Sequence, residues 1–258
     1  PWGFGAHTRS DWAEGLELKV GEPAEYLFYV GCAGSFDNRN KQVSRTLARL
    51  MQQADVDFSI LGETEMCNGD LARRSGNEFL FQTLAEMNVT TLQEAGVQKI
   101  VTACPHCFHT LGKEYGDYGG DFEVVHHTQL LAELREQGKL KVSDRDTTLT
   151  YHDPCYMGRI DDSHDAPRKA LGGEILEMHR CRDKTFCCGA GGARMWVEED
   201  ADKRVNLIRA QEALDTGADE VGTGCPFCMT MLTDGMKTLG SETQVRDVSE
   251  IMAEQLEA

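Results

Sequence analysis

The sequence predicts an α/β protein built from two tandem βαβ repeats that are related by pseudo-twofold symmetry, each with a cysteine cluster at the C-terminal ends of its strands. Three observations support this prediction. Short β-rich segments alternate with helical ones along the 258 residues, which is typical of parallel sheets. Four cysteines recur after 120 to 123 residues, and the sequences around them recur with them. Such self-similarity at a fixed spacing indicates an internal duplication.

The duplication is visible in the cysteine positions. Four cysteines of the first half have counterparts in the second: Cys32 with Cys155, Cys67 with Cys187, Cys104 with Cys225, and Cys107 with Cys228. The flanking sequence "GVQKIVTACPHCFHTL" corresponds to "GADEVGTGCPFCMTML". Cys181 has no counterpart, and we interpret it as a small buried hydrophobic residue. We place a linker from an upstream domain at 1–22, the first repeat at 23–143 and the second repeat at 144–258.

Each predicted strand ends beside a cysteine. The β-rich segments are 24–31, 97–103, 147–154 and 218–224. Helical patterns lie between and after them, at 42–54, 76–95, 128–138, 203–217 and 248–258. Ligands of parallel α/β sheets gather at the carboxyl ends of the strands. We therefore expect cysteines that are distant in sequence to converge into one cluster in each repeat.

Composition excludes several classes of function. A net charge of −17 at pH 7 argues against nucleic acid and anionic membrane surfaces as partners, since both would repel the chain. No apolar stretch approaches the roughly 20 residues that a membrane helix needs. The N-terminus lacks a signal-peptide pattern, so we expect a cytoplasmic protein, and a start at Pro1 suggests a piece of a longer chain. Ten cysteines in such a protein favour metal ligation over disulfides.

The two CxxC motifs, "CPHC" and "CPFC", allow a rival interpretation. Each follows a predicted strand and precedes a helical pattern, as in a thioredoxin-like redox site, where the helix N-terminus lowers the pKa of a thiol. The upstream cysteines at matching offsets favour a metal site, because a thioredoxin site does not use them. A zinc ribbon usually keeps its CxxC pairs within about 20 residues, whereas these pairs are 121 residues apart.

The second half carries a resemblance to a known family. Its cysteines occur in the order Cys155, Cys187-Cys188-Gly189 and "CPFC". This pattern resembles the cysteine-rich CCG domain of heterodisulfide reductases and related iron–sulfur oxidoreductases, and the resemblance covers nearly the whole chain. It implies a Rossmann-like repeat in which five cysteines hold a non-cubane [4Fe–4S] cluster. The matching ligands are Cys155, Cys187, Cys188, Cys225 and Cys228.

Glycines surround the adjacent cysteine pair. Gly189, Gly191 and Gly192 follow it, and Gly69 stands at the position of Gly189 in the first repeat. Glycine permits positive φ values and close approach of the backbone to a cofactor. It also leaves amide N–H groups that can donate to cluster sulfide. We therefore interpret these four glycines as cofactor-binding residues.

The first half departs from the five-cysteine pattern at Asn68, which replaces the second cysteine of the pair. A carboxamide cannot replace a bridging thiolate. The remaining cysteines are Cys32, Cys67, Cys104 and Cys107. Four thiolates suit either a cubane [4Fe–4S] cluster or a tetrahedral zinc ion. We favour the cubane, and zinc stays open.

The resemblance implies an iron–sulfur oxidoreductase module that relays electrons to or from a disulfide, quinone or flavoprotein partner. Because only one five-cysteine site is intact, electron relay is a better prediction than cleavage of a heterodisulfide between two such sites. His152 and Tyr156 are candidate catalytic residues over the C-terminal cluster.

The same resemblance names the expected partners. They are a ferredoxin-type iron–sulfur domain or subunit, a flavoprotein, and a quinone-linked membrane subunit through which the chain would associate with a membrane. Two other functions remain open. One is a metal-bearing assembly or docking subunit without redox chemistry, and the other is a thioredoxin-like thiol/disulfide oxidoreductase.

Overall fold

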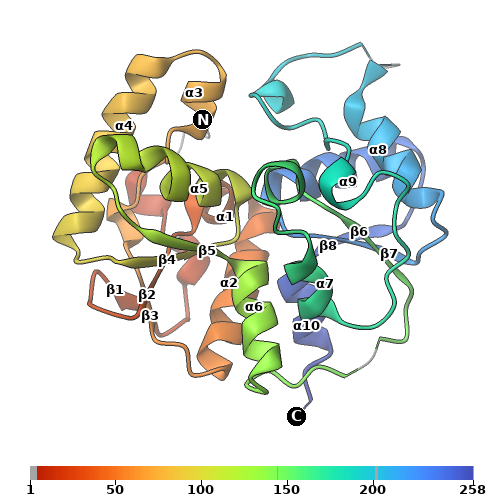
Figure 1. Ribbon diagram of the computed structural model, residues 1–258, viewed down its shortest axis with the longest axis horizontal. Helices are drawn as coiled ribbons and strands as arrows, with labels where there is room; N and C mark the ends of the chain where they lie inside the picture. Colours follow the sequence, from red (N-terminus) through yellow and green to blue (C-terminus); the bar gives the residue numbers. More distant parts are fainter. Residues whose placement is uncertain (1–4, 144, 201–202, 258) are drawn as a thin grey trace. The chain divides into compact units, whose positions relative to one another are not determined.

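The computed structural model describes residues 5–143, 145–200 and 203–257. The chain forms two compact units, Pro1–Leu130 and Leu131–Ala258. Each unit is an α/β structure around a parallel sheet, which confirms the predicted fold class. Figure 1 shows the helices packed around the sheet of each unit.

The first unit contains a five-stranded sheet in the order β1-β3-β2-β4-β5. Every neighbouring pair is parallel, and Leu27 of β2 lies opposite Ser59 of β3 and Ile100 of β4. The strands are β1 (Lys19–Val20), β2 (Tyr26–Phe28), β3 (Phe58–Ile60), β4 (Lys99–Thr102) and β5 (Glu123–His126). The predicted segments at 24–31 and 97–103 therefore contain β2 and β4, which pair with each other and lie between β3 and β5.

Helices connect these strands and begin at recognisable signals. The Asp37 side chain accepts from the Asn40 amide at the start of α2, and the Asn77 side chain accepts from the Leu80 amide at the start of α4, as N-cap residues do. The α-helices are α1 (Gly31–Phe36), α2 (Asn38–Gln53), α3 (Asp70–Arg74), α4 (Glu78–Glu94), α5 (Pro105–His109) and α6 (His127–Glu136). Shorter turns are η1 (Ala6–Thr8), η2 (Asp11–Ala13), η3 (Gly62–Thr64), the π-helix η4 (Thr110–Glu114) and η5 (Tyr115–Tyr118).

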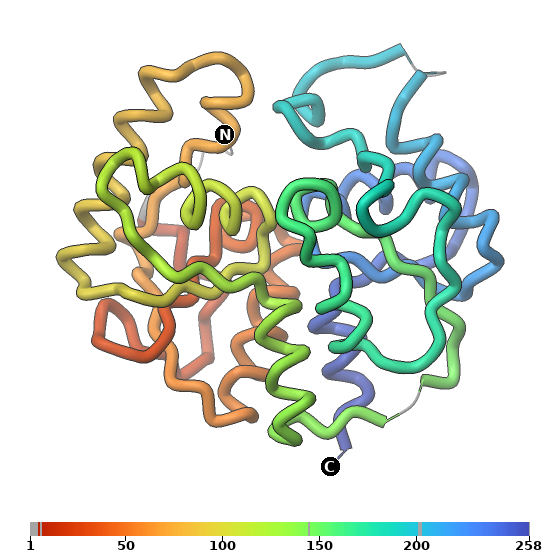
Figure 2. The backbone as a smooth tube through the Cα atoms, viewed as in Figure 1, coloured from red at the N-terminus to blue at the C-terminus, as the bar shows by residue number. Residues whose placement is uncertain are grey.

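The N-terminal segment packs as part of the first unit (red in Figure 2). Trp12 is buried, and its ring meets Phe28 edge to face at 5.7 Å. Arg45 donates to the backbone carbonyls of Trp12 and Glu14 at 2.6 and 2.8 Å. Strand β1, which lies within the predicted linker, pairs with β3. Residues 1–4 of that linker lie outside the described residues, and the proposed boundaries at 22 and 143 stay predictions.

The second unit repeats the central part of the first. Its parallel sheet has the order β6-β7-β8, which corresponds to β2-β4-β5, and an isolated parallel bridge between Leu149 and Ile175 stands where β3 pairs with β2. The strands are β6 (Leu149–His152), β7 (Glu220–Thr223) and β8 (Gln244–Asp247). The helices and turns are η6 (Tyr156–Ile160), α7 (Asp165–Leu171), η7 (Arg182–Lys184), η8 (Arg194–Trp196), α8 (Val205–Leu214), α9 (Pro226–Thr238) and α10 (Val248–Glu254).

A buried carboxylate organises the second unit next to its first cysteine. Arg168 of α7 donates to both carboxylate oxygens of Asp153, at 2.7 and 2.9 Å. The same carboxylate accepts the Arg182 amide, and the Asp153 carbonyl accepts the Thr185 hydroxyl. Asp153 thereby ties β6 to α7 and to the loop that leads to Cys187.

This buried pair predicts a strong effect on stability. We expect Arg168→Met to lower the free energy of unfolding by about 3 kcal/mol, because removing one partner leaves a buried charge uncompensated. Lys169→Met is the matched control. Lys169 pairs with Glu136 on the surface, with both side chains more than half exposed, so its loss should cost less than about 0.5 kcal/mol. Urea unfolding followed by circular dichroism measures both, and equal effects would contradict the assigned role of Asp153.

Candidate metal centres

Five cysteines of the second unit come from three loops at the carboxyl ends of its strands. Cys155 follows β6 and precedes the π-helix η6. Cys187 and Cys188 lie in the loop after η7. Cys225 follows β7 and is the N-cap of α9, and Cys228 lies in the first turn of that helix. Pro226 takes the first helical position, where proline costs no hydrogen bond.

The five thiols form one continuous chain of side-chain hydrogen bonds. The order is Cys155, Cys187, Cys188, Cys228 and Cys225. The last three are buried, and the first two are half-buried. The structure therefore brings together all five cysteines predicted for the C-terminal site.

One thiol in this chain ionises far more readily than its neighbours. Hydrogen bonds from Cys155 and Cys188, and then from the amides of Gly189 and Gly191, hold the pKa of Cys187 far below its usual range. The pKa of Cys155 is raised by the hydrogen bond with Cys187, followed by burial. Because like charges repel, the thiols cannot all ionise unless a cation compensates them.

Gly189 shapes the turn beneath the adjacent cysteines. Its φ is +96°, and its amide donates to the Cys187 Sγ at 3.3 Å. A Cβ at this position would approach the Met231 methyl group at 3.2 Å and the Asn206 amide nitrogen at 3.3 Å. Gly192 also has a positive φ, whereas Gly191 does not. Gly191 contributes its amide hydrogen bond to Cys187 instead.

The first unit brings four thiols together in the corresponding place. Cys32 lies in α1 after β2, Cys67 follows η3, Cys104 is the N-cap of α5, and Cys107 lies in that helix. Hydrogen bonds join Cys32 to Cys67 and Cys104 to Cys107, and electrostatic interactions link the two pairs. The hydrogen bond from Cys32 is the main cause that lowers the pKa of Cys67 to about 6.

Asn68 occupies the position of the missing thiol. It is buried, its side-chain oxygen accepts from the Asp70 amide at 3.0 Å, and its carbonyl accepts from Tyr115. Its side-chain nitrogen is buried and has no partner among the described residues. Gly69 has φ +85° and donates its amide to Cys67. This turn therefore matches the turn at Gly189.

Arg9 is a charged residue of the first centre that sequence reasoning missed. Its guanidinium is 5% exposed and pairs with the buried carboxylate of Glu65 at 3.1 Å. Glu65 also accepts the amides of Val30 and Gly31, at 2.9 Å each. The charge of Arg9 acts on both Cys32 and Cys67. No pattern in the segment 1–22 distinguishes Arg9 from a solvated arginine.

A network of charged and titratable side chains begins at Asp70, whose amide donates to the side chain of Asn68. Asp70 contacts His106 at 2.8 Å and Arg74 at 3.0 Å, and Arg74 also pairs with Glu114. The guanidinium of Arg74, which follows this cysteine turn, is therefore held by two acidic side chains and is not available to bind a substrate.

The two candidate catalytic residues differ in position. His152 ends β6 and is fully buried, and a nitrogen of its ring lies within 4.8 Å of the sulfurs of Cys188 and Cys228. Burial, together with the charge of Arg209, lowers the pKa of His152 well below its usual range. Tyr156 begins η6 and is 8% exposed. The ring of His152 therefore lies beside the thiol chain and away from solvent.

Cys181 differs from the prediction. Its side chain is half-buried, and its thiol forms a hydrogen bond with Glu177. Cys181 is not part of the chain of five thiols. The interpretation of Cys181 as a small buried hydrophobic residue is wrong, because its side chain is partly exposed and its thiol has a polar partner near the surface.

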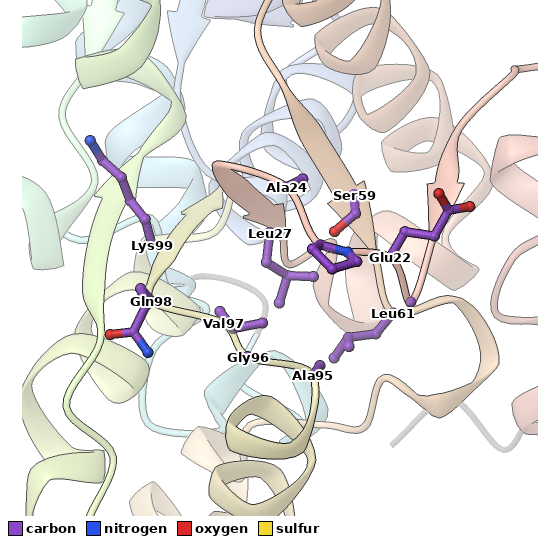
Figure 3. A pocket seen from close by; sticks show the side chains of 12 residues that line it. Glu22, Ala24, Leu27, Ser59, Leu61, Ala95, Gly96, Val97, Gln98 and Lys99 are labelled. Atoms are coloured by element: carbon purple, nitrogen blue, oxygen red, sulfur yellow. The ribbon is translucent and has the colours of Figure 1, made fainter.

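A small pocket at the other end of the first sheet is not part of either centre. It has a volume of about 50 Å³ and lies where β2 and β4 begin, opposite the strand ends that carry cysteines. Figure 3 shows the side chains of Glu22 and Lys99 extending away from each other at its rim. No cysteine lines it.

The thiol sets fit multi-iron clusters. Iron–sulfur clusters are held by cysteine thiolates, and a bound cation deprotonates a coordinating thiol outright. Without a cation, repulsion between thiolates allows only one thiol of each set to ionise easily. A bound cation compensates the negative charge, so the other thiols of the set can ionise as well. Four thiols also satisfy tetrahedral zinc, so the donor set of the first unit fits either group.

Comparison with known proteins agrees with the cysteine pattern. The family model CCG, described as a cysteine-rich domain, matches residues 26–112 and 149–233. The "Probable iron-sulfur-binding oxidoreductase FadF" of Bacillus subtilis is 43% identical over 98% of this chain and 38% of that protein. The "EtfAB:quinone oxidoreductase" of Syntrophomonas wolfei is 43% identical over 100% of this chain and 39% of that protein.

A methanogen protein shares the same region. One subunit of the dihydromethanophenazine:CoB--CoM heterodisulfide reductase of Methanosarcina barkeri is 34% identical over 93% of this chain and 61% of that protein. The chain thus spans between 38% and 61% of the length of these three relatives. The first matched segment contains the four cysteines of the first unit, the second contains the five of the second unit, and the chain belongs to the CCG cysteine-rich domain family.

Proposed function

We propose that this chain is an iron–sulfur electron-transfer module of a larger heterodisulfide reductase-like oxidoreductase. The observation that carries the proposal is the continuous chain of five thiols in the second unit. The family and the names of its relatives, which include an iron–sulfur-binding oxidoreductase, support the same function. The longer relatives support a role as one part of a larger protein.

The proposed cofactors differ between the two units. In the second unit, Cys155, Cys187, Cys188, Cys225 and Cys228 would hold a non-cubane [4Fe–4S] cluster. In the first unit, Cys32, Cys67, Cys104 and Cys107 would hold a second [4Fe–4S] cluster, with zinc as the alternative. When bound, an iron–sulfur cluster supplies a one-electron carrier whose potential depends on charge, hydrogen bonds and exposure.

The chain's own residues set the surroundings of that carrier. The amides of Gly69 and Gly189 donate to ligand sulfurs, and Arg9 places a positive charge beside the first set. Hydrogen bonds and positive charge both stabilise the more negative, reduced state of a cluster. Buried thiols restrict the access of water to each centre.

Partners and substrate follow from the relatives. A flavoprotein and a quinone are proposed because a relative is named an EtfAB:quinone oxidoreductase, and a disulfide because another belongs to a heterodisulfide reductase. A ferredoxin-type domain would deliver the electrons. Among the described residues, no helix combines the length and hydrophobicity needed to cross a membrane. We propose that any association with a membrane occurs through another domain or subunit.

Metal analysis tests the proposal directly. We expect anaerobically reconstituted chain to contain about eight irons if both sites hold [4Fe–4S] clusters, with a visible absorption band that dithionite bleaches. About four irons with one zinc would assign zinc to the first unit. A chain without iron after reconstitution would overturn the proposed function and favour a docking subunit or a thioredoxin-like oxidoreductase.

The adjacent cysteines give a second test. We expect Cys188→Ser to perturb the spectrum and potential of the second unit's cluster, because an alkoxide is a harder and more basic ligand than a thiolate. The signal of the first unit should persist. Cys181→Ser is the matched control, since Cys181 lies outside the thiol chain. The assignment of Cys188 would fail if both variants had the wild-type electron paramagnetic resonance (EPR) spectrum.

Asn68 provides a third test. We expect Asn68→Cys to shift the first unit's cluster towards the non-cubane form, because Gly69 and Gly189 share a positive φ and the same amide hydrogen bond. Asn68→Ser controls for loss of the carboxamide. EPR spectra after reconstitution compare the variants. An unchanged spectrum, with the new cysteine titrating as a free thiol, would show that the turn cannot bring a fifth ligand to the cluster.

A further inference from the structure

We propose that His152 is a positioning residue of the second unit's centre, donating its Nε2–H to a sulfur of the bound cluster, and that Arg209 sets the tautomer that makes this possible. The inference rests on the proposed iron–sulfur cluster and deepens that function. It assigns a role to one candidate residue and adds Arg209, which the sequence did not indicate.

The position of His152 carries the first step. Its side chain is fully buried at the end of β6. One ring nitrogen lies within 4.8 Å of the sulfurs of Cys188 and Cys228. The Nε2 atom is buried and has no hydrogen-bond partner among the described residues. A buried N–H without a partner is costly, so this atom should meet an acceptor when the centre is complete.

The contact with Arg209 fixes the proton on the ring. Arg209 Nε donates to His152 Nδ1 at 2.8 Å. A guanidinium has donors and no acceptor, so the ring nitrogen that faces it must carry a lone pair. In a neutral imidazole the opposite nitrogen then carries the hydrogen. A ring turned by 180° would place Cδ2 where Nδ1 lies and would lose this hydrogen bond, so the contact fixes the orientation of the ring as well.

The tautomer of His152 decides whether the residue can donate a hydrogen bond to the sulfurs or coordinate a metal. An imidazole nitrogen needs its lone pair to coordinate a metal, and here the lone pair belongs to the nitrogen beside Arg209. His152 therefore presents an N–H to the sulfurs and would not ligate iron. A hydrogen bond to cluster sulfur stabilises the more negative state, so it raises the reduction potential.

Arg209 is itself held in place. Its side chain in α8 is fully buried, and its NH1 group donates to the Glu212 carboxylate and the Arg180 carbonyl, each at 2.9 Å. Glu212 also binds the side chain of Arg180 at 2.9 Å. These contacts fix the guanidinium on one side of the imidazole. With Nδ1 held by Arg209, we assign Nε2 as the nitrogen that faces the sulfurs of Cys188 and Cys228.

The first unit lacks this arrangement. In the corresponding sequence "LFYVGCAG", no histidine precedes Cys32. Tyr29 of that segment is buried, and its hydroxyl donates to the Met66 carbonyl at 2.6 Å. The hydrogen bond from His152 should therefore affect the second centre alone, and the first centre serves as an internal control.

The test combines measurements of the reduction potential with pulsed EPR spectroscopy, both on the reconstituted 258-residue chain. Removing the donor in His152→Leu should lower the potential of the second cluster, changing its reduced-to-oxidised ratio about tenfold at a fixed potential, which is about 59 mV for a one-electron couple. His152→Gln keeps an amide oxygen for Arg209 and an N–H for the cluster, so it should restore most of the potential. His179→Gln, at an exposed histidine that lines a shallow surface pocket, should change nothing.

A spectroscopic signature separates positioning from a structural role. In ¹⁵N-histidine-labelled chain, we expect a weak nitrogen coupling to the paramagnetic second cluster and a proton coupling that disappears in D2O. The nitrogen coupling should be absent from His152→Gln, whose amide N–H keeps an exchangeable proton coupling, and both couplings should be present in His179→Gln. If His152→Leu does not fold, the labelled wild type and His152→Gln still decide the question.

Three results would overturn the inference. They are a strong nitrogen coupling typical of a bound ligand, no histidine coupling in a chain that holds its clusters, and an unchanged potential in His152→Leu. Iron and sulfide analysis of the wild type keeps the two proposals apart. A chain with clusters and no coupling contradicts the role of His152 alone, whereas a chain without clusters contradicts the proposed function as well.

Discussion

Repulsion between closely packed thiolates is the constraint on which both centres depend. Five sulfurs in one unit and four in the other lie in hydrogen-bonding or electrostatic contact with one another. Without a cation, each set lowers the pKa of one thiol and raises the pKa of others. Such a set is a poor structural core and a good receptor for a positively charged cluster.

The charged residues near the thiols differ between the two units. A buried carboxylate lies beside the first cysteine of each set, Glu65 in the first unit and Asp153 in the second. Glu65 pairs with Arg9 from the N-terminal segment, whereas Asp153 pairs with Arg168 of α7. The two carboxylates do not occupy corresponding positions of the duplication, because Glu65 lies shortly before Cys67 whereas Asp153 lies shortly before Cys155. Divergence has therefore changed the electrostatics of the centres while the thiol arrangement persisted.

This divergence suits an electron relay with two unequal centres. The first unit surrounds its four thiols with Arg9 and an ionic group around Asp70. The second unit places a buried histidine and a buried arginine beside five thiols. Different charges and hydrogen bonds produce different reduction potentials. A fixed difference between two centres in one chain would give electrons a preferred direction.

The sequence by itself determined the duplication, the fold class, the strands β2, β4, β6 and β7, and the convergence of the cysteines, because all of these depend on local patterns and on the geometry of parallel sheets. It did not reveal β1, β3, β5 or β8, which are all short. The segments of β5 and β8, "EVVH" and "QVRD", also mix polar and apolar residues. It also did not reveal Arg9 or Arg209. An arginine has the same helical or loop pattern whether it faces water or a buried partner, and only tertiary packing decides which arginine lies near the cysteines.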